Sequence, residues 1–213
     1  HTIIIVAHGS EEYGAADSRY DWCIGSYHAV YKMHPEWFGR IDVFLNFDAL
    51  RPDAPQLVIN ATPEYGTFLG EFASKLQLPE GCWPEGAAVA GLHGPWSDDY
   101  NYAVNGIPSL ICGKGPSQWS SMNYHTQFDN YTVFKTERRI VSYIAELYTR
   151  YIDLFDGLDL PPLDFAPVFR DLTGSLGAAE KFCVDETEAL RHIASEAEAC
   201  AGKVYGTISG LNG

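Results

Sequence analysis

The chain has 213 residues, 46% of them hydrophobic and 20% charged, which is the composition of a globular protein with one sizeable core. Its formal net charge of −14 excludes nucleic acid and anionic membranes as favoured partners, because both repel an acidic surface. The longest apolar runs have the length of strands, so we expect no membrane-spanning segment.

The five cysteines have no short paired spacing of the kind that builds a zinc knuckle or a redox motif. We therefore expect buried thiols at Cys23, Cys82, Cys112, Cys183 and Cys200. Their odd number slightly favours a reducing compartment, and both a cytoplasmic and a secreted location stay open.

Apolar runs alternate with helical patterns along the first 155 residues. Strands are predicted over residues 2–7, 41–47, 56–60 and 107–112. Helices are predicted over residues 15–33, 63–77 and 135–155. This alternation predicts a three-layer α/β/α sandwich. Residues 77–99, rich in proline and glycine, are expected to form a long loop in which Trp96 packs under the chain.

The composition changes after residue 155. Residues 156–162 are expected to be a linker, and two helices are predicted over residues 164–176 and 178–201. The glycine-rich residues 206–213 are expected to form a loose tail. We therefore divide the chain into a first part, 1–155, and a helical extension, 156–213.

Two adjacent glutamates, Glu11 and Glu12, follow the first predicted strand directly. Ligand sites of α/β folds lie where strands end, so these carboxylates are candidates for an active-site loop. The alternative is that they open the next helix, where negative charge suits the helix dipole.

Two later segments offer matching ligand types. Asp48 follows the second predicted strand, and His125 lies in a polar stretch after the fourth. Two carboxylates and an imidazole that converge on one crevice form a ligand set suited to zinc.

These segments resemble the co-catalytic di-zinc exopeptidase family that includes bacterial aminopeptidases, glutamate carboxypeptidase and the transferrin receptor ectodomain. Glu11-Glu12 resembles the family's Glu-Glu, Asp48 its Asn-x-Asp, and residues 124–129 its Tyr-His-Thr-x-x-Asp. Residues 96–100 with 106–108 resemble the family's Ser-Asp and Gly-Ile-Pro block. The resemblance spans about residues 2–151 and implies a mixed sheet.

The resemblance implies that Glu11 is the general base that takes a proton from a metal-bound water. It implies that Glu12 and His125 hold one zinc and that Asp48 belongs to the other, two zincs being the family's complement. Tyr124 either offers its hydroxyl to the oxyanion or is a half-buried aromatic of the loop.

Asp129 either orients neighbouring ligands from outside the metal's ligand set or forms an ordinary turn. Asp98 is given no role, and His8 is expected to be a bystander that is hydrogen-bonded or solvated.

The chain departs from the family pattern at its start. The family's further histidine and its metal-bridging aspartate precede the Glu-Glu segment, and no His-x-Asp block stands before Glu11. We therefore expect the carboxy-terminal part of a peptidase, incomplete at the amino terminus, with one zinc or none, and little activity from this piece alone.

The resemblance implies a zinc-dependent aminopeptidase or glutamate-carboxypeptidase-like enzyme that acts on a peptide or small amide. Two alternatives stay open: a one-zinc glutaminyl-cyclase-like acyltransferase, whose family usually has tryptophan where this chain has Tyr124, and a non-catalytic receptor-like module. Helical domains of the receptor branch mediate dimers, so a homodimer through the carboxy-terminal helices is also expected.

Overall fold

A mixed four-stranded sheet lies at the centre of the protein. The computed structural model describes every residue except 15–21, 49–50, 114–116, 131–136 and 180–183. The sheet has the order β1–β4–β2–β3, with β1 at Phe44–Asn46, β2 at Leu57–Ala61, β3 at Ala87–Ala90 and β4 at Ser109–Cys112. The pairs β1–β4 and β2–β3 are parallel, and β2–β4 is antiparallel.

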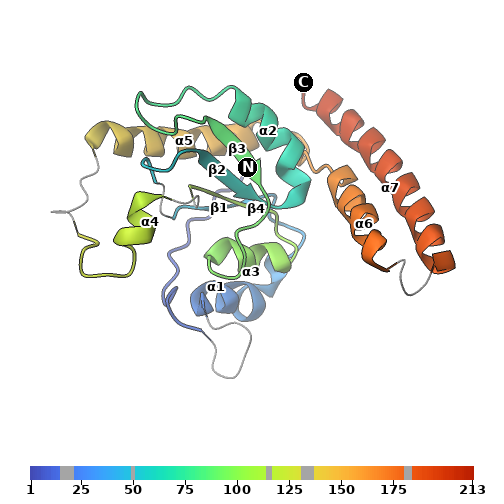
Figure 1. The fold of residues 1–213 in the computed structure, drawn as a ribbon, viewed down its shortest axis with the longest axis horizontal. Helices are drawn as coiled ribbons and strands as arrows, with labels where there is room; N and C mark the ends of the chain where they lie inside the picture. The colour runs from blue at the N-terminus through green and yellow to red at the C-terminus, as the bar shows by residue number, and fades with distance from the viewer. Residues whose placement is uncertain (15–21, 49–50, 114–116, 131–136, 180–183) are drawn as a thin grey trace.

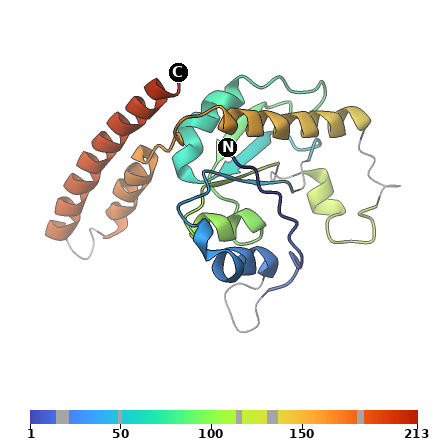
Figure 2. The same ribbon diagram turned by 180° about the vertical axis from the view of Figure 1, so that it is seen from behind.

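Helices cover both faces of the sheet (Figures 1 and 2). Helices α2 (Gly66–Ser74) and α5 (Arg138–Asp156) lie on one face, and α1 (Ile24–His28) and α3 (Asp98–Val104) lie on the other. The larger apolar core joins the sheet to α2 and α5, and a smaller core of Val30, Tyr102 and Ile107 lies on the opposite side. The predicted three-layer α/β/α sandwich with a mixed sheet is confirmed.

Short helical segments complete the described chain. They are a π-helical turn at Ala29–Met33, 3₁₀ turns at Pro35–Trp37 and Pro63–Tyr65, and α4 at Gln118–Met122. The helix predicted over 15–33 is therefore observed only from Ile24, and residues 15–21 lie outside the described residues.

Helix α5 shows why the helical spacing was informative. Its buried residues recur on one stripe at Ile140, Leu147, Tyr148, Tyr151 and Phe155. Such spacing turns a single helix face toward the sheet. The helix ends before Gly157, whose N–H donates to the Asp153 carbonyl at 3.1 Å.

The strand predicted over residues 2–7 is wrong. Residues 1–10 belong to no helix or strand, and Ile5 is 93% exposed. A strand requires a neighbour that pairs with its backbone, and the described sheet ends at β1 without taking up this segment. The apolar run therefore lies outside the sheet and is exposed.

The loop expected over residues 77–99 contains an unexpected strand, β3. It consists of small residues between turns and pairs with β2 from Leu57–Ala87 to Asn60–Ala90. Trp83 packs in the core and its Nε1 donates to the Arg51 carbonyl at 2.8 Å. Trp96, expected to be packed, is 54% exposed instead, because it lies in the turn before α3 rather than under it.

The carboxy-terminal residues form a helical hairpin of α6 (Ala166–Ala179) and α7 (Val184–Leu211). The loose tail expected over 206–213 is wrong, since α7 continues to Leu211. Each glycine in a helix costs about 1 kcal/mol relative to alanine, and packing against α6 offsets this cost. The side chain of Asn212 accepts from the backbone N–H groups of Asp159 and Leu160, both at 3.1 Å.

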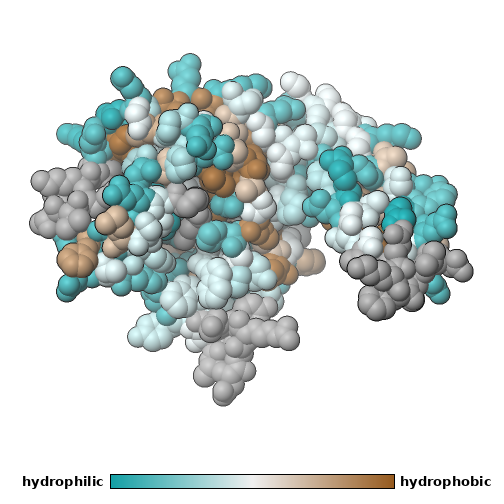
Figure 3. Space-filling model, in the orientation of Figure 1, coloured by the Kyte–Doolittle hydropathy of each residue, from teal (hydrophilic) through white to brown (hydrophobic). Residues whose placement is uncertain are grey.

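The expectation of buried thiols is only partly correct. Cys23 and Cys112 are buried, Cys82 is half-buried and Cys200 is exposed on α7, whereas Cys183 lies outside the described residues. No helix of the described part of the chain is long and apolar enough to cross a membrane. Apolar side chains nevertheless form patches on the surface, over the central body of the molecule (Figure 3).

Candidate functional site

The structure brings Glu12 and His125 into contact. The Nε2 atom of His125 lies 3.1 Å from Glu12 Oε1, across 113 positions of sequence. Both side chains are about half exposed, so the pair faces solvent rather than the core. An imidazole nitrogen and a carboxylate oxygen are both ligands that zinc accepts.

Glu11 lies beside this pair and is less exposed than Glu12. Burial, followed by the charges of Glu12 and Asp48, raises the pKa of Glu11, and a hydrogen bond from Trp22 opposes this shift. Trp22 Nε1 donates to Glu11 Oε1 at 3.3 Å. A carboxylate with a raised pKa is a stronger base than an ordinary glutamate, which suits the role of a general base.

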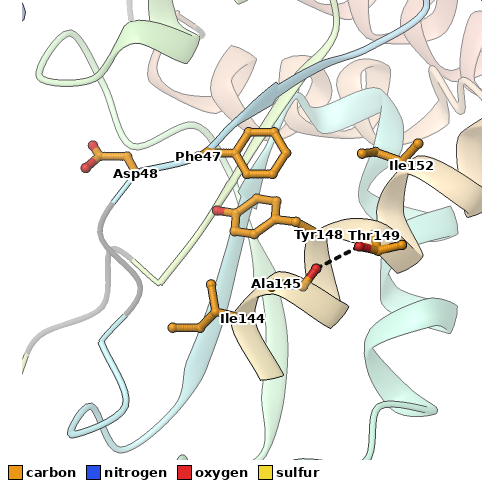
Figure 4. A pocket seen from close by; sticks show the side chains of 7 residues that line it. All are labelled: Phe47, Asp48, Ile144, Ala145, Tyr148, Thr149 and Ile152. Carbon is orange, nitrogen blue, oxygen red and sulfur yellow. Dashed lines mark hydrogen bonds between the residues drawn. The ribbon is translucent and has the colours of Figure 1, made fainter. Parts of the chain in front are cut away.

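Asp48 lies two residues beyond the end of β1, close enough to Glu11 for its charge to raise the Glu11 pKa. Its carboxylate points away from Phe47 and α5 (Figure 4). Asp48 and Phe47 line an apolar groove of about 370 Å³ together with α5 residues such as Ile144 and Tyr148. Asp48 therefore borders the groove and is the charged residue among those that line it.

A buried polar network fixes the end of β1 just before Asp48. Asn46 Nδ2 donates to Ser97 Oγ at 3.0 Å and to Asp99 Oδ1 at 3.1 Å. From the other face, Tyr148 Oη donates to the Asn46 carbonyl at 2.9 Å. Because buried polar groups are costly unless they are hydrogen-bonded, this network favours one position of the strand end.

His125 has a left-handed backbone with φ of 57°. This region is uncommon for residues other than glycine, and such conformations recur at functional sites. The ring of Tyr124 stacks on that of His125 with centroids 3.8 Å apart, and the Arg51 guanidinium lies 5.5 Å from the Tyr124 ring. Tyr124 is therefore next to the Glu12–His125 pair, partly exposed to solvent.

Asp129 lies in a turn of the same loop. Its backbone N–H donates to the Thr126 carbonyl at 3.1 Å, and its side chain is exposed. This geometry favours the turn-forming alternative for Asp129.

His8 is hydrogen-bonded within the fold. Its Nε2 lies 3.0 Å from Tyr102 Oη, and its ring packs against those of Tyr102 and Phe44. Asp98 is near enough to influence the pKa of His8 and that of Glu11. No role was expected for Asp98 from its sequence context, and the structure adds it to the negative charges around Glu11.

The residues match a zinc site in the type of ligand but not in the number of ligands. Glu12 and His125 are an oxygen and a nitrogen donor in contact, and the charges of Asp48 and Asp98 act on the neighbouring Glu11. Yet no group of three or more potential ligands converges anywhere in the described ranges. Catalytic zinc sites typically have three protein ligands.

Sequence reasoning missed Trp22 and Arg51. Trp22 contacts Glu11 from 11 positions away and stacks on His125 with centroids 6.3 Å apart. Neither residue has a motif or a spacing that relates it to the glutamates, so only the folded chain shows their proximity.

A three-layer sandwich with a mixed sheet, which also brings a carboxylate and an imidazole into contact, places the protein in the class of α/β proteins. The family model of peptidase family M28 matches residues 1–147, and the chain belongs to this family. The family is one of zinc-dependent peptidases, so the general class of the protein is that of hydrolases. No curated protein and no solved structure is significantly similar to the chain.

Proposed function

We propose that the protein is a zinc-dependent exopeptidase, an aminopeptidase or a glutamate-carboxypeptidase-like enzyme, in which Glu11 is the general base. The observation that supports this most directly is the 3.1 Å contact of Glu12 with His125 directly beside Glu11. A ligand pair next to a carboxylate that is not part of it is the arrangement that a metal-assisted hydrolase needs.

Each site residue has its own proposed role. Glu12 and His125 would hold one zinc, and Asp48 would belong to a second. Bound zinc supplies a water of lowered pKa and polarises the scissile carbonyl. Glu11 takes the proton of the attacking water and returns it to the leaving amine, and the Tyr124 hydroxyl donates to the oxyanion.

Two protein ligands in contact predict weak zinc binding, so we expect one zinc or none per chain and little turnover without added zinc. The test therefore uses excess zinc and both aminoacyl and glutamyl peptides as substrates. Zinc content is measured by elemental mass spectrometry after the excess is removed.

The decisive variant is Glu11→Gln, which removes the base and keeps the side-chain volume. We expect unchanged zinc content and a fall in kcat of about 10²–10⁴-fold. His125→Ala should lose the zinc itself. Glu36→Gln is the matched control, because Glu36 is an exposed glutamate of the 3₁₀ turn at Pro35–Trp37.

Undiminished hydrolysis by Glu11→Gln would contradict the assignment of the base. An absence of turnover by the wild-type chain with zinc fully bound would contradict the exopeptidase. Cyclisation of a glutaminyl peptide without hydrolysis would instead support the one-zinc acyltransferase. A chain that binds no zinc and has no activity would support the receptor-like module.

A further inference from the structure

Trp22 contacts the two functional groups that the proposed function depends on. Its indole N–H donates to Glu11 Oε1 at 3.3 Å, and its ring stacks on His125 with an interplanar angle of 29°. His125 in turn contacts Glu12. One side chain thus touches the proposed base and a proposed ligand from two different loops.

The backbone around Trp22 is joined to the Glu11 loop. Cys23 N–H donates to the Glu11 carbonyl at 2.7 Å, and Ile24 N–H donates to the Tyr13 carbonyl at 2.8 Å. These two bonds join the two residues that follow Trp22 to the Glu11 loop, so they hold the backbone of Trp22 close to that of Glu11.

Further contacts join this part of the backbone to the rest of the fold. Asn101 of α3, itself buried, donates from Nδ2 to the Cys23 carbonyl at 3.1 Å and to Ser26 Oγ at 2.9 Å. Gly25 lies so close to the Gly9 carbonyl that a Cβ there would clash with it. Buried contacts of the residues next to Trp22 therefore help to determine the position of its half-buried side chain.

We propose that Trp22 is a positioning residue that holds Glu11 and His125 in their working arrangement; this inference rests on the proposed function. Its N–H occupies one oxygen of the Glu11 carboxylate and leaves the other to accept a proton. Its ring is stacked on the imidazole and restricts rotation of the His125 side chain. Neither task requires Trp22 to touch substrate.

Two variants separate the two contacts. Trp22→Phe keeps a ring for His125 and removes the N–H, whereas Trp22→Leu removes both. Trp96→Phe is the control, because Trp96 is an exposed tryptophan in the turn before α3. Circular dichroism and urea unfolding of each variant establish that it is folded.

The first readout needs no metal. The ring protons of His125, observed by NMR in the labelled chain, are shifted by the stacked indole in addition to Tyr124. We expect this contribution to persist in part in Trp22→Phe, to vanish in Trp22→Leu and to stay unchanged in Trp96→Phe. A general loss of stability would not change the His125 signals selectively.

The second readout is turnover with excess zinc. Loss of one hydrogen bond to a charged group predicts a fall in kcat of about tenfold in Trp22→Phe with KM unchanged. Trp22→Leu should in addition weaken zinc binding, measured by competition with a chelator. If Trp22→Leu fails to fold, the Phe variant still tests the hydrogen bond through kcat.

Unshifted His125 signals in Trp22→Leu, or a wild-type kcat in Trp22→Phe, would overturn the inference. These outcomes differ from failure of the proposed function, which would show as no hydrolysis by the zinc-loaded wild-type chain.

Discussion

The imidazole of His8 is half-buried between β1 and α3, where it meets Phe44 and Tyr102. Burial lowers the pKa of His8, and the charge of Asp98 opposes this shift. The folded state therefore favours the neutral form of the His8 ring. In this state Tyr102 Oη lies 3.0 Å from His8 Nε2.

His8 should make the free energy of unfolding depend on pH. In the unfolded chain His8 titrates near its ordinary pKa of about 6.5, so below this pH the unfolded state binds more protons than the folded one. Stability should fall as pH drops from about 7 toward about 5. Urea unfolding at both pH values should show a smaller fall for His8→Gln.

His192→Gln, an exposed histidine of α7, is the control and should behave like the wild type. An equal pH dependence of His8→Gln and the wild type would contradict a lowered pKa at His8.

At the scale of elements, two apolar runs of similar composition adopt different structures. Residues 57–61 form β2, which pairs on both edges with β3 and β4. Residues 2–7 have no such pairing in the described sheet and stay exposed. Burial, rather than β-propensity, distinguishes the two.

Alanine substitutions measure this difference. Ile59 is fully buried, so Ile59→Ala should cost about 2–5 kcal/mol of unfolding free energy through the lost packing and the cavity. Ile5→Ala should change stability by less than about 0.5 kcal/mol, as surface substitutions do. Both are measured by urea unfolding at one pH.

A cost at Ile5 comparable with that at Ile59 would show that residues 2–7 are buried in solution. The control is Ile152→Ala in α5, which is half-buried and should give an intermediate cost.

At the scale of the whole molecule, the α6–α7 hairpin joins the sheet domain through polar contacts. The Asp164 backbone N–H donates to the Glu64 carbonyl, and Thr67 Oγ1 donates to Asp164 Oδ2, both at 2.7 Å. Helix α7 exposes a stripe of apolar residues at Leu190, Ile193 and Val204, of which Val204 also lines an apolar groove with Phe165 and Phe169. Such a stripe on a helix is suited to pairing with another helix.

We propose that this stripe mediates a homodimer. Ile193→Glu combined with Val204→Glu introduces charge on the stripe and should convert a dimer into a monomer without loss of helix content. Sedimentation velocity measures the mass, and circular dichroism measures the helix. Ser142→Glu on the exposed face of α5 is the control.

A monomeric wild-type chain at concentrations of about 100 µM would contradict the dimer, since stable interfaces bind well below this level.

Much of the fold was predictable because its signals are local. The apolar stripe of α5 and the runs that became β1, β2 and β4 follow helical and strand periods that a sequence shows directly. β3 was missed because its small residues lie among turns, and the end of α7 was missed because three glycines suggested a loop.

By itself the sequence determined the class of fold and the identity of the candidate site residues, since Glu11, Glu12, Asp48 and His125 stand in recognisable motifs. Only the tertiary structure decided which of them meet. It placed Glu12 against His125 and Trp22 against Glu11, and it left residues 2–7 outside the sheet. The reason is physical: secondary structure depends on neighbours a few residues apart, whereas contacts across 113 positions depend on how the whole chain packs.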